Sequence, residues 1–183
     1  HLHALANARD PRPVVVDTRS KSIGHEETFP RDLTDRGVLG RELIRMVDAV
    51  ATRLHKAGVV GRTIQLKVRF GDFTTITRSA TIAEPTDKAN VVRSTAEALL
   101  AKVDIEPGVR LLGVNVSQLS EPVAQQLTLD DAAGPGRNET DDIVEAIRDR
   151  FGGDAIGPAT LARPGKPLDR LVQGQQQWGP DDL

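Results

Sequence analysis

Hydrophobic and polar positions follow two different periods along the first 119 residues of this 183-residue chain. Two segments repeat apolar residues at spacings of three and four, which is typical of helices with one buried face. Four segments alternate polar and apolar residues or are rich in β-branched residues, as strands are. The expected elements are a strand in two parts over 14–29, a helix over 35–58, strands over 64–70 and 73–82, a helix opening at 85–87 and a strand over 109–116. This β-α-β-β-α-β order predicts an α+β fold in which two helices cover one face of a four-stranded sheet.

Turn and cap residues mark where several of these elements are expected to end. Gly58 is a suitable helix stop, because glycine readily adopts the left-handed conformation found there. Gly71 and Asp72 form a candidate two-residue hairpin turn. Thr86 or Asp87 is the expected N-cap of the second helix, since either side chain can accept a hydrogen bond from a backbone N–H of the first turn.

The sheet face that the helices leave open is predicted to carry cations, hydroxyls and a glycine. By strand alternation its residues are Ser22, Gly24, Thr28, Gln65, Lys67, Arg69, Thr75, Thr77 and Ser79. Lysine and arginine bring positive charge to phosphate oxygens, while hydroxyl and backbone N–H groups donate short hydrogen bonds. The pattern is therefore suited to contact with a nucleic-acid backbone. A polar open face is also typical of any soluble α+β domain, so a module that binds no nucleic acid stays an alternative.

Two charged residues do not fit this face simply. Glu26 shares the parity of Ser22 and Gly24, which places an acid among the cations. Arg78 has the parity of Ile76 on the core side, and only a bulge or an edge position would free it. No helix carries the cluster of Asn and Arg that reads base edges, so any DNA binding is expected to be independent of sequence.

Charge and composition narrow the class of protein. Residues 14–119 hold sixteen Lys and Arg against thirteen Asp and Glu, whereas residues 120–183 hold six against twelve. A basic body with an acidic tail can face a polyanion although the net charge is −2. The lack of cysteine excludes disulfides and zinc-thiolate sites, and four Phe, one Trp and no Tyr argue against a stacking platform for bare bases. Neither a run of roughly 18 apolar residues nor a signal-peptide core is present, which favours the cytoplasm.

Both ends of the chain are expected to lie outside the domain at 14–119. Residues 1–13 have the character of a helix end followed by a linker, because Pro11 and Pro13 interrupt regular structure. Residues 120–183 are expected to form an acidic, largely flexible tail with a short helix at about 139–151. The apolar stripe of that helix is Ile143, Val144, Ile147 and Phe151.

Four segments keep an order and a spacing that carry a specific resemblance. They are Lys21–Phe29, Gly61–Thr75, Val109–Val114, and Leu2–Ala6 with Asp10–Val14. Together they resemble the C-terminal part of Y-family DNA polymerases, of the DNA polymerase IV type, from about residue 1 to residue 120. The resemblance implies that 1–13 are the end of the thumb and a linker, and that 14–119 are the little-finger domain. In the family, this domain lays its sheet in the DNA major groove and grips the template and primer backbones.

The resemblance also implies which residues contact DNA. They are Lys21, Ser22, Gly24, Lys67, Arg69, Thr75, Thr77, Arg78, Ser79, Arg110 and Asn115. The lysines and arginines would be cationic contacts, and the hydroxyl residues would donate hydrogen bonds along the hairpin. Asn115 stands where some relatives carry a cation, which implies a weaker contact there.

Catalysis is not expected from this polypeptide alone. Family polymerases hold two magnesium ions on palm carboxylates, and no segment of this chain matches that motif. No cofactor or metal is expected within residues 1–183, because the histidines stand alone and the acids are scattered. The parent protein is expected to be a DNA-directed DNA polymerase that copies past damaged template. A catalytically dead adaptor is the alternative.

A motif in the tail resembles the sliding-clamp-binding peptide of bacterial members of the family. Gln126 would form hydrogen bonds, and Leu127 and Leu129 would fill a hydrophobic cleft. Asp130 departs from the pattern, because the stronger form of the motif has an aromatic residue there. The expected partners are primer-template DNA and the bacterial sliding clamp, with no membrane, and the chain is expected to be a monomer.

Overall fold

Four antiparallel strands form one sheet, and their order across it is β1-β4-β2-β3. The computed structural model describes residues 2–13, 20–122, 137–153 and 155–162. Its elements are α1 (Leu2–Ala6), β1 (Ser22–Leu33), α2 (Arg36–Lys56), β2 (Gly61–Phe70), β3 (Thr75–Thr86), α3 (Ala89–Leu100), β4 (Val109–Ser117), α4 (Arg137–Phe151) and the 3-10 helix η2 (Ala159–Leu161). The predicted order of strands and helices is confirmed, and β1 and β3 are the two edge strands. The short apolar strand expected at 14–16 lies outside the described residues.

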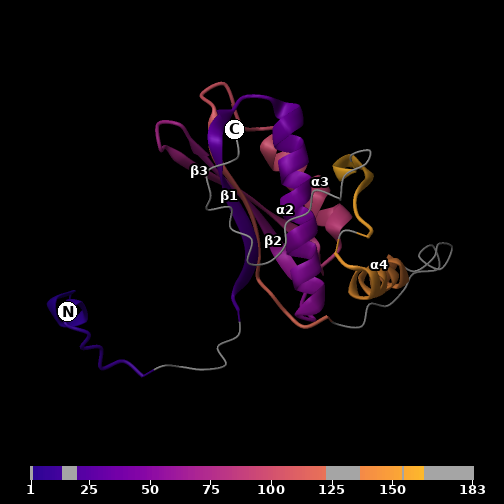
Figure 1. Ribbon diagram of the computed structural model, residues 1–183, viewed down its shortest axis with the longest axis horizontal. Helices are drawn as coiled ribbons and strands as arrows, with labels where there is room; N and C mark the ends of the chain where they lie inside the picture. Colours follow the sequence, from indigo (N-terminus) through magenta and orange to yellow (C-terminus); the bar gives the residue numbers. More distant parts are fainter. Residues whose placement is uncertain (1, 14–19, 123–136, 154, 163–183) are drawn as a thin grey trace.

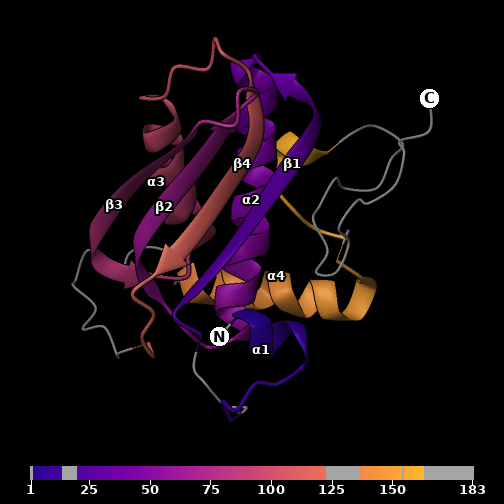
Figure 2. The ribbon, with the colours of Figure 1, turned by 90° about the vertical axis from the view of Figure 1, so that its left-hand side faces the viewer.

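Helices α2 and α3 pack against one face of the sheet, and the other face has no described helix over it (Figures 1 and 2). Between these layers lies an apolar core whose central side chains are at most 1% exposed. They include Leu39, Leu43, Met46, Val50 and Leu54 of α2, Val92 and Ala96 of α3, and Ile64, Leu66, Val68, Leu112, Val114 and Val116 of the sheet. Burial of this apolar surface, at about 25 cal/mol per Å², drives the two layers together.

Helix α2 begins and ends at residues whose chemistry suits those positions. Asp35 is its N-cap, and the carboxylate accepts hydrogen bonds from the backbone N–H groups of Gly37 and Val38 at 2.6 and 3.0 Å. These two bonds hold the pKa of Asp35 below its usual value, and the bond from Val38 has the larger effect. At the other end Gly58 has a φ of 61°, and the N–H of Val59 donates to the Leu54 carbonyl at 3.1 Å. Gly58 is therefore the helix stop that was predicted, in a Schellman motif.

The loop between β2 and β3 is longer than the predicted two-residue turn at 71–72. Strand β3 begins only at Thr75, because Phe73 turns the chain with a φ of 66° instead of extending it. The Asp72 carboxylate accepts hydrogen bonds from the N–H and the hydroxyl of Thr74 at 2.8 and 2.9 Å, which stabilises the turn. The prediction that a strand starts at Phe73 is wrong for this reason.

Two edge strands are longer than predicted, and one helix cap is different. Strand β1 continues past Phe29 to Leu33 through an irregular register, which an edge strand with a proline tolerates. Strand β3 continues to Thr86, so this residue cannot cap α3. The N-cap is Lys88, whose N–H donates to the Thr86 hydroxyl at 3.0 Å. The prediction of Thr86 or Asp87 as the cap is therefore wrong.

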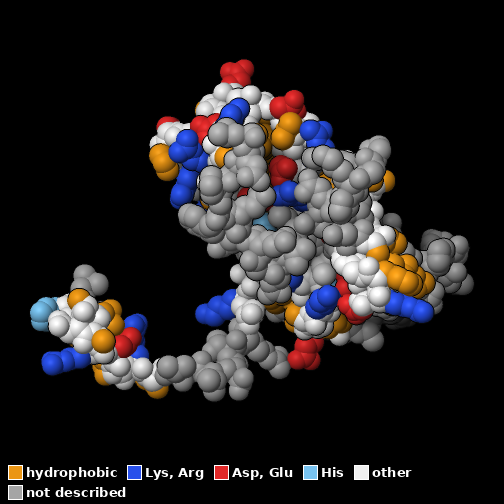
Figure 3. All heavy atoms as spheres, in the orientation of Figure 1, with side chains coloured by type: hydrophobic (Ala, Val, Ile, Leu, Met, Phe, Trp, Pro, Cys, Tyr) orange, Lys and Arg blue, Asp and Glu red, His pale blue; other side chains and the backbone are white. Residues whose placement is uncertain are grey.

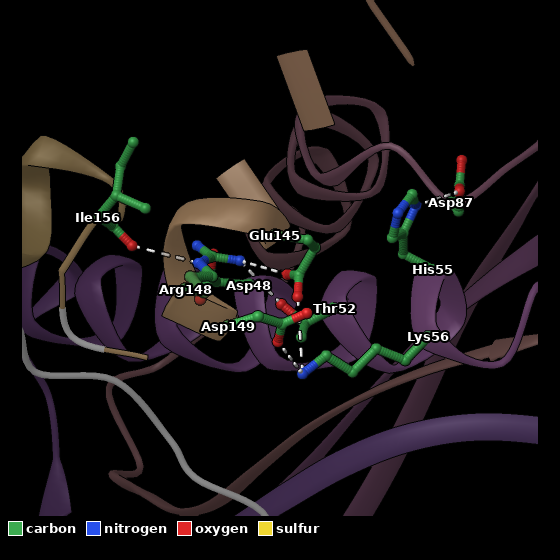
Figure 4. Close-up of polar contacts among 9 residues, drawn as sticks. All are labelled: Asp48, Thr52, His55, Lys56, Asp87, Glu145, Arg148, Asp149 and Ile156. Atoms are coloured by element: carbon green, nitrogen blue, oxygen red, sulfur yellow. Dashed lines mark hydrogen bonds and ion pairs between the residues drawn. The ribbon is translucent and has the colours of Figure 1, made fainter. Parts of the chain in front are cut away.

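Helix α4 lies on α2, on the side of the molecule away from the sheet (Figures 1 and 4). Arg148 of α4 is 9% exposed and donates hydrogen bonds to Asp48 at 3.0 Å and Thr52 at 3.1 Å, both on α2. The same guanidinium donates to Glu145 at 2.9 Å and to the Ile156 carbonyl at 3.2 Å. The part of the tail that the structure describes is thus attached to the domain by polar contacts.

The apolar stripe of α4 is only partly buried. Val144 faces α2, beside a cavity of about 290 Å³ between the two helices. Ile143 and Phe151 are 59% and 68% exposed. Polar pairing, rather than the stripe, therefore orients this helix.

Candidate nucleic-acid interface

The uncovered face of the sheet carries most of the residues that the sequence placed there. The register pairs Gly24 with Asn115, and Asn115 with Gln65 on its other side. It also pairs Gln65 with Ser79 and Lys67 with Thr77. Because directly paired residues point to the same face, the polar side chains form continuous rows across all four strands. The residues brought together on this face are Ser22, Gly24, Thr28, Gln65, Lys67, Arg69, Thr75, Thr77, Ser79 and Asn115.

Two cations stand on this face, and each has a neighbour that orients it. Lys67 donates to the Glu26 carboxylate at 2.8 Å, and both side chains remain solvent-accessible at 35% and 53% exposure. Arg69 donates through Nε to the Thr75 hydroxyl at 2.9 Å. An exposed ion pair is worth at most about 1 kcal/mol, so a phosphate group can displace Glu26 from Lys67 at small cost.

A hollow of about 470 Å³ lies on the face between β1, β4 and β2. Gly24 and Gly113 line it and place no side chain over the backbone. A Cβ on Gly113 would lie 2.8 Å from the Cβ of Glu26, and one on Gly24 would lie 2.9 Å from the Val114 carbonyl oxygen. The close approach of β1 and β4 thus requires glycine, and the same positions let a ligand reach the backbone.

Arg78 does not belong to this face but lies on the core side that its parity indicated, and its contact with DNA stays a prediction. It pairs with Leu66, whose side chain is in the core, and its own side chain is exposed only because β3 is an edge strand. Its guanidinium donates to the carbonyl of Thr77 at 3.1 Å. Arg78 therefore points from the sheet edge on the helix side, away from the row that contains Lys67.

Arg110 stands at one end of the face, beside the β2–β3 loop, rather than in the rows. The register shifts between Arg69 and Phe70, which makes Arg110 an additional residue in β4. Its Nε donates to Asp32 at 3.0 Å, and its guanidinium carbon lies 5.0 Å from the centre of the Phe73 ring. Figure 3 shows Lys and Arg side chains gathered around this hairpin.

An arginine of α2 holds the outer edge of β1, a contact that the sequence patterns did not indicate. Arg53 donates to the Gly24 carbonyl at 2.8 Å and lies 3.1 Å from Nδ1 of His25. Burial, and then the charge of Arg53, lower the pKa of His25. A neutral His25 can accept the hydrogen bond of Arg53, which fixes the strand next to the hollow. Lys21 and Ser22 lie exposed at the start of this strand.

Other kinds of site find little support in the described ranges. They contain no group of three or more His, Asp or Glu side chains able to hold a metal ion. The helices in those ranges include none of sufficient length and apolarity to cross a membrane. The motif Gln126, Leu127 and Leu129 lies outside the described residues.

The fold and the face define an α+β domain with an uncovered, hydroxyl-rich and cationic sheet. Residues 20–129 match the impB/mucB/samB family C-terminal domain, and the chain belongs to this family. It is 48% identical over 126 residues to DNA polymerase IV of Streptomyces coelicolor. The aligned segment is 69% of this chain and 26% of that protein. It is 36% identical over 164 residues to DNA polymerase IV of Desulfatibacillum aliphaticivorans. That aligned segment is 87% of this chain and 41% of the relative. The chain thus spans less than half the length of these relatives.

Two solved structures are similar to this chain. A match to the "Complex of beta-clamp processivity factor and little finger domain of PolIV" has a TM-score of 0.47 and 24% identity, over 59% of this chain and 97% of that one. The "Y-family DNA polymerase chimera Dbh-Dpo4(243-245)-Dbh" superposes with a TM-score of 0.51 at 21% identity, over 66% of this chain and 35% of that one. The superposition on this polymerase chimera confirms the expected α+β fold.

Proposed function

We propose that this domain binds the sugar-phosphate backbone of primer-template DNA through its uncovered sheet face, independently of base sequence. The proposal is supported by the rows of hydroxyl and cationic side chains over a glycine-lined hollow, which suit phosphate oxygens. The face offers no helix that could enter the major groove and read base edges, within the described residues. The alternative is a protein-interaction module that binds no DNA.

The domain is proposed to act as the DNA-gripping part of a DNA polymerase IV that copies past damaged template. The names of the relatives assign polymerase activity to full-length proteins. This chain covers 26% and 41% of the length of two of them. Magnesium would serve the parent enzyme in its palm, and no step of DNA gripping by this face requires it. The monomeric state stays a prediction.

The proposal is tested by the salt dependence of duplex binding. If three phosphates are contacted, by Lys21, Lys67 and Arg69, affinity falls about 40-fold between 50 and 200 mM salt, because each contact releases condensed counterions. Fluorescence anisotropy of a labelled duplex measures this slope, with a second duplex of scrambled sequence as the control for sequence independence. Affinity that is undetectable at 50 mM salt, or does not change with salt, would contradict the proposal.

We also propose that residues 126–129 bind a sliding clamp. The motif begins four residues after Pro122, where the described body ends. Its glutamine and two leucines suit a cleft that combines hydrogen bonds with apolar contacts. Asp130 and Asp131 follow it directly, and such an acidic flank disfavours burial of the motif in an apolar core.

Replacing Leu127 and Leu129 by alanine is expected to lower clamp affinity at least about tenfold, because the apolar anchors of such peptides carry most of the binding energy. Surface plasmon resonance with immobilised clamp measures the loss. The matched control is Leu168→Ala with Leu171→Ala, which removes two other leucines of the tail and should leave the affinity unchanged. Equal affinities for the two double variants would exclude the motif.

A further inference from the structure

A phenylalanine ring stands exposed at the end of the β2–β3 hairpin. Phe73 is 65% exposed, and its backbone has a φ of 66°. Bulky residues rarely occupy this left-handed region, whereas glycine occupies it freely. Such outliers persist where the surrounding structure holds them, and they cluster at sites that contact ligands.

The folded domain itself gains little from this ring. Phe73 is not a member of the core cluster, and its ring has one ring-face contact in the described chain, the guanidinium of Arg110 at 5.0 Å. The loop is already held by other bonds, since Gly71 donates to the Gly108 carbonyl at 3.2 Å and Arg110 pairs with Asp32 at 3.0 Å. The turn could therefore form without an aromatic residue.

The position of the ring places it beside the candidate DNA face. Arg69, the residue before the end of β2, pairs with Thr75, the first residue of β3, and this is the last open-face pair before the loop. In Figure 1 the loop between β2 and β3 projects to the side away from the helices, the side on which the open face lies. A ligand that runs along the rows of the face would thus reach Phe73 as it leaves the sheet.

We propose that Phe73 stacks on an unpaired base of the template strand, next to the duplex held by the open face. The inference rests on the proposed function and adds a contact to single-stranded DNA. In a duplex both faces of an internal base are already stacked, so a solvent-exposed ring gains most from a base that lies beyond the last pair. Arg110 supports the ring from one side and supplies positive charge close to the adjoining phosphate. The scarcity of aromatic residues excludes an extended platform, but one ring suffices for one base.

The test compares two labelled DNAs that share the same duplex, one blunt and one with a single-stranded template overhang. The full chain should bind the overhang DNA more tightly than the blunt one. Phe73→Gly is expected to lose about tenfold in affinity for the overhang DNA and less than about twofold for the blunt duplex. Phe73→Trp, which keeps a stacking ring, should retain the preference. The midpoint of thermal unfolding of Phe73→Gly should equal or exceed that of the parent, because glycine relieves the positive φ.

The outcomes separate this inference from the function on which it rests. If Phe73→Gly loses the same affinity for both DNAs, or loses none for either, the proposed base stacking is wrong, whereas the proposed duplex binding is unaffected. If the unaltered chain binds neither DNA at low salt, the proposed function fails and stacking fails with it. A loss accompanied by a lower unfolding midpoint would show that the ring serves the fold, and that too would overturn the inference.

Discussion

Replacing Lys67 and Arg69 by glutamate is expected to weaken duplex binding about a hundredfold at 100 mM salt. The change removes two cations that strand β2 presents side by side on the open face, and introduces two anions at the same positions. Each replacement, through the lost phosphate contact and the new repulsion together, costs roughly 1.4 kcal/mol, and the two sum to about two powers of ten in affinity. The loss should be similar on every DNA sequence, because phosphate contacts carry no sequence information.

The matched control for this variant changes the net charge equally on the helix side. Arg41 of α2 and Lys102, which follows α3, are both exposed. Arg41→Glu with Lys102→Glu should change duplex affinity only a few-fold, through the long-range field of the molecule. If both double variants lose the same affinity, the interaction is not localised on the sheet face.

Replacing Arg148 by methionine is expected to release α4 from α2. Methionine keeps most of the volume but leaves the carboxylate of Asp48, 7% exposed, without its arginine partner under α4. Removing one member of a buried ion pair costs about 3 kcal/mol or more. If α4 leaves α2, the Asp48 carboxylate becomes hydrated, which limits the loss in free energy of unfolding. The expected result is therefore faster amide hydrogen exchange in α4 with unchanged protection in the sheet.

The second variant in this test distinguishes the ion pair from simple packing. Asp48→Leu combined with Arg148→Met replaces the buried pair by apolar side chains of similar size, which is often neutral or stabilising. Slow exchange in α4 should therefore return in the double variant. If Arg148→Met leaves the exchange of α4 unchanged, the contacts of Arg148 do not hold the helix.

Strand alternation alone predicted the sheet and its open face well. Gln65, Lys67 and Arg69 alternate with the core residues of β2, and nothing in the fold interrupts that period. The resemblance to Y-family polymerases implied the little-finger fold in advance, and the family match and the observed sheet agree with it. Propensity failed where a single residue leaves the regular conformation, as at Phe73, which is a good strand former held in a turn.

Contacts between distant segments could not be obtained from local patterns. The pair of Asp48 and Arg148 joins residues 100 positions apart, and the pair of Arg110 and Asp32 depends on a bulge in β4. Parity placed Arg78 on the core side correctly, and its exposure there follows from the position of β3 at the edge of the sheet; only the resemblance named it as a DNA contact. The acid Glu26 was placed correctly on the open face, but its bond to Lys67 required the observed register.

A comparison of salt slopes decides whether the open face of the sheet grips phosphates. Duplex affinity is measured from 50 to 200 mM salt for the unaltered chain and for Lys67→Ala with Arg69→Ala. Each removed phosphate contact lowers the slope of log affinity against log salt by about one, so the account predicts a slope that is shallower by about two. An identical slope in the two proteins would contradict it, because the cations of β2 would then touch no phosphate.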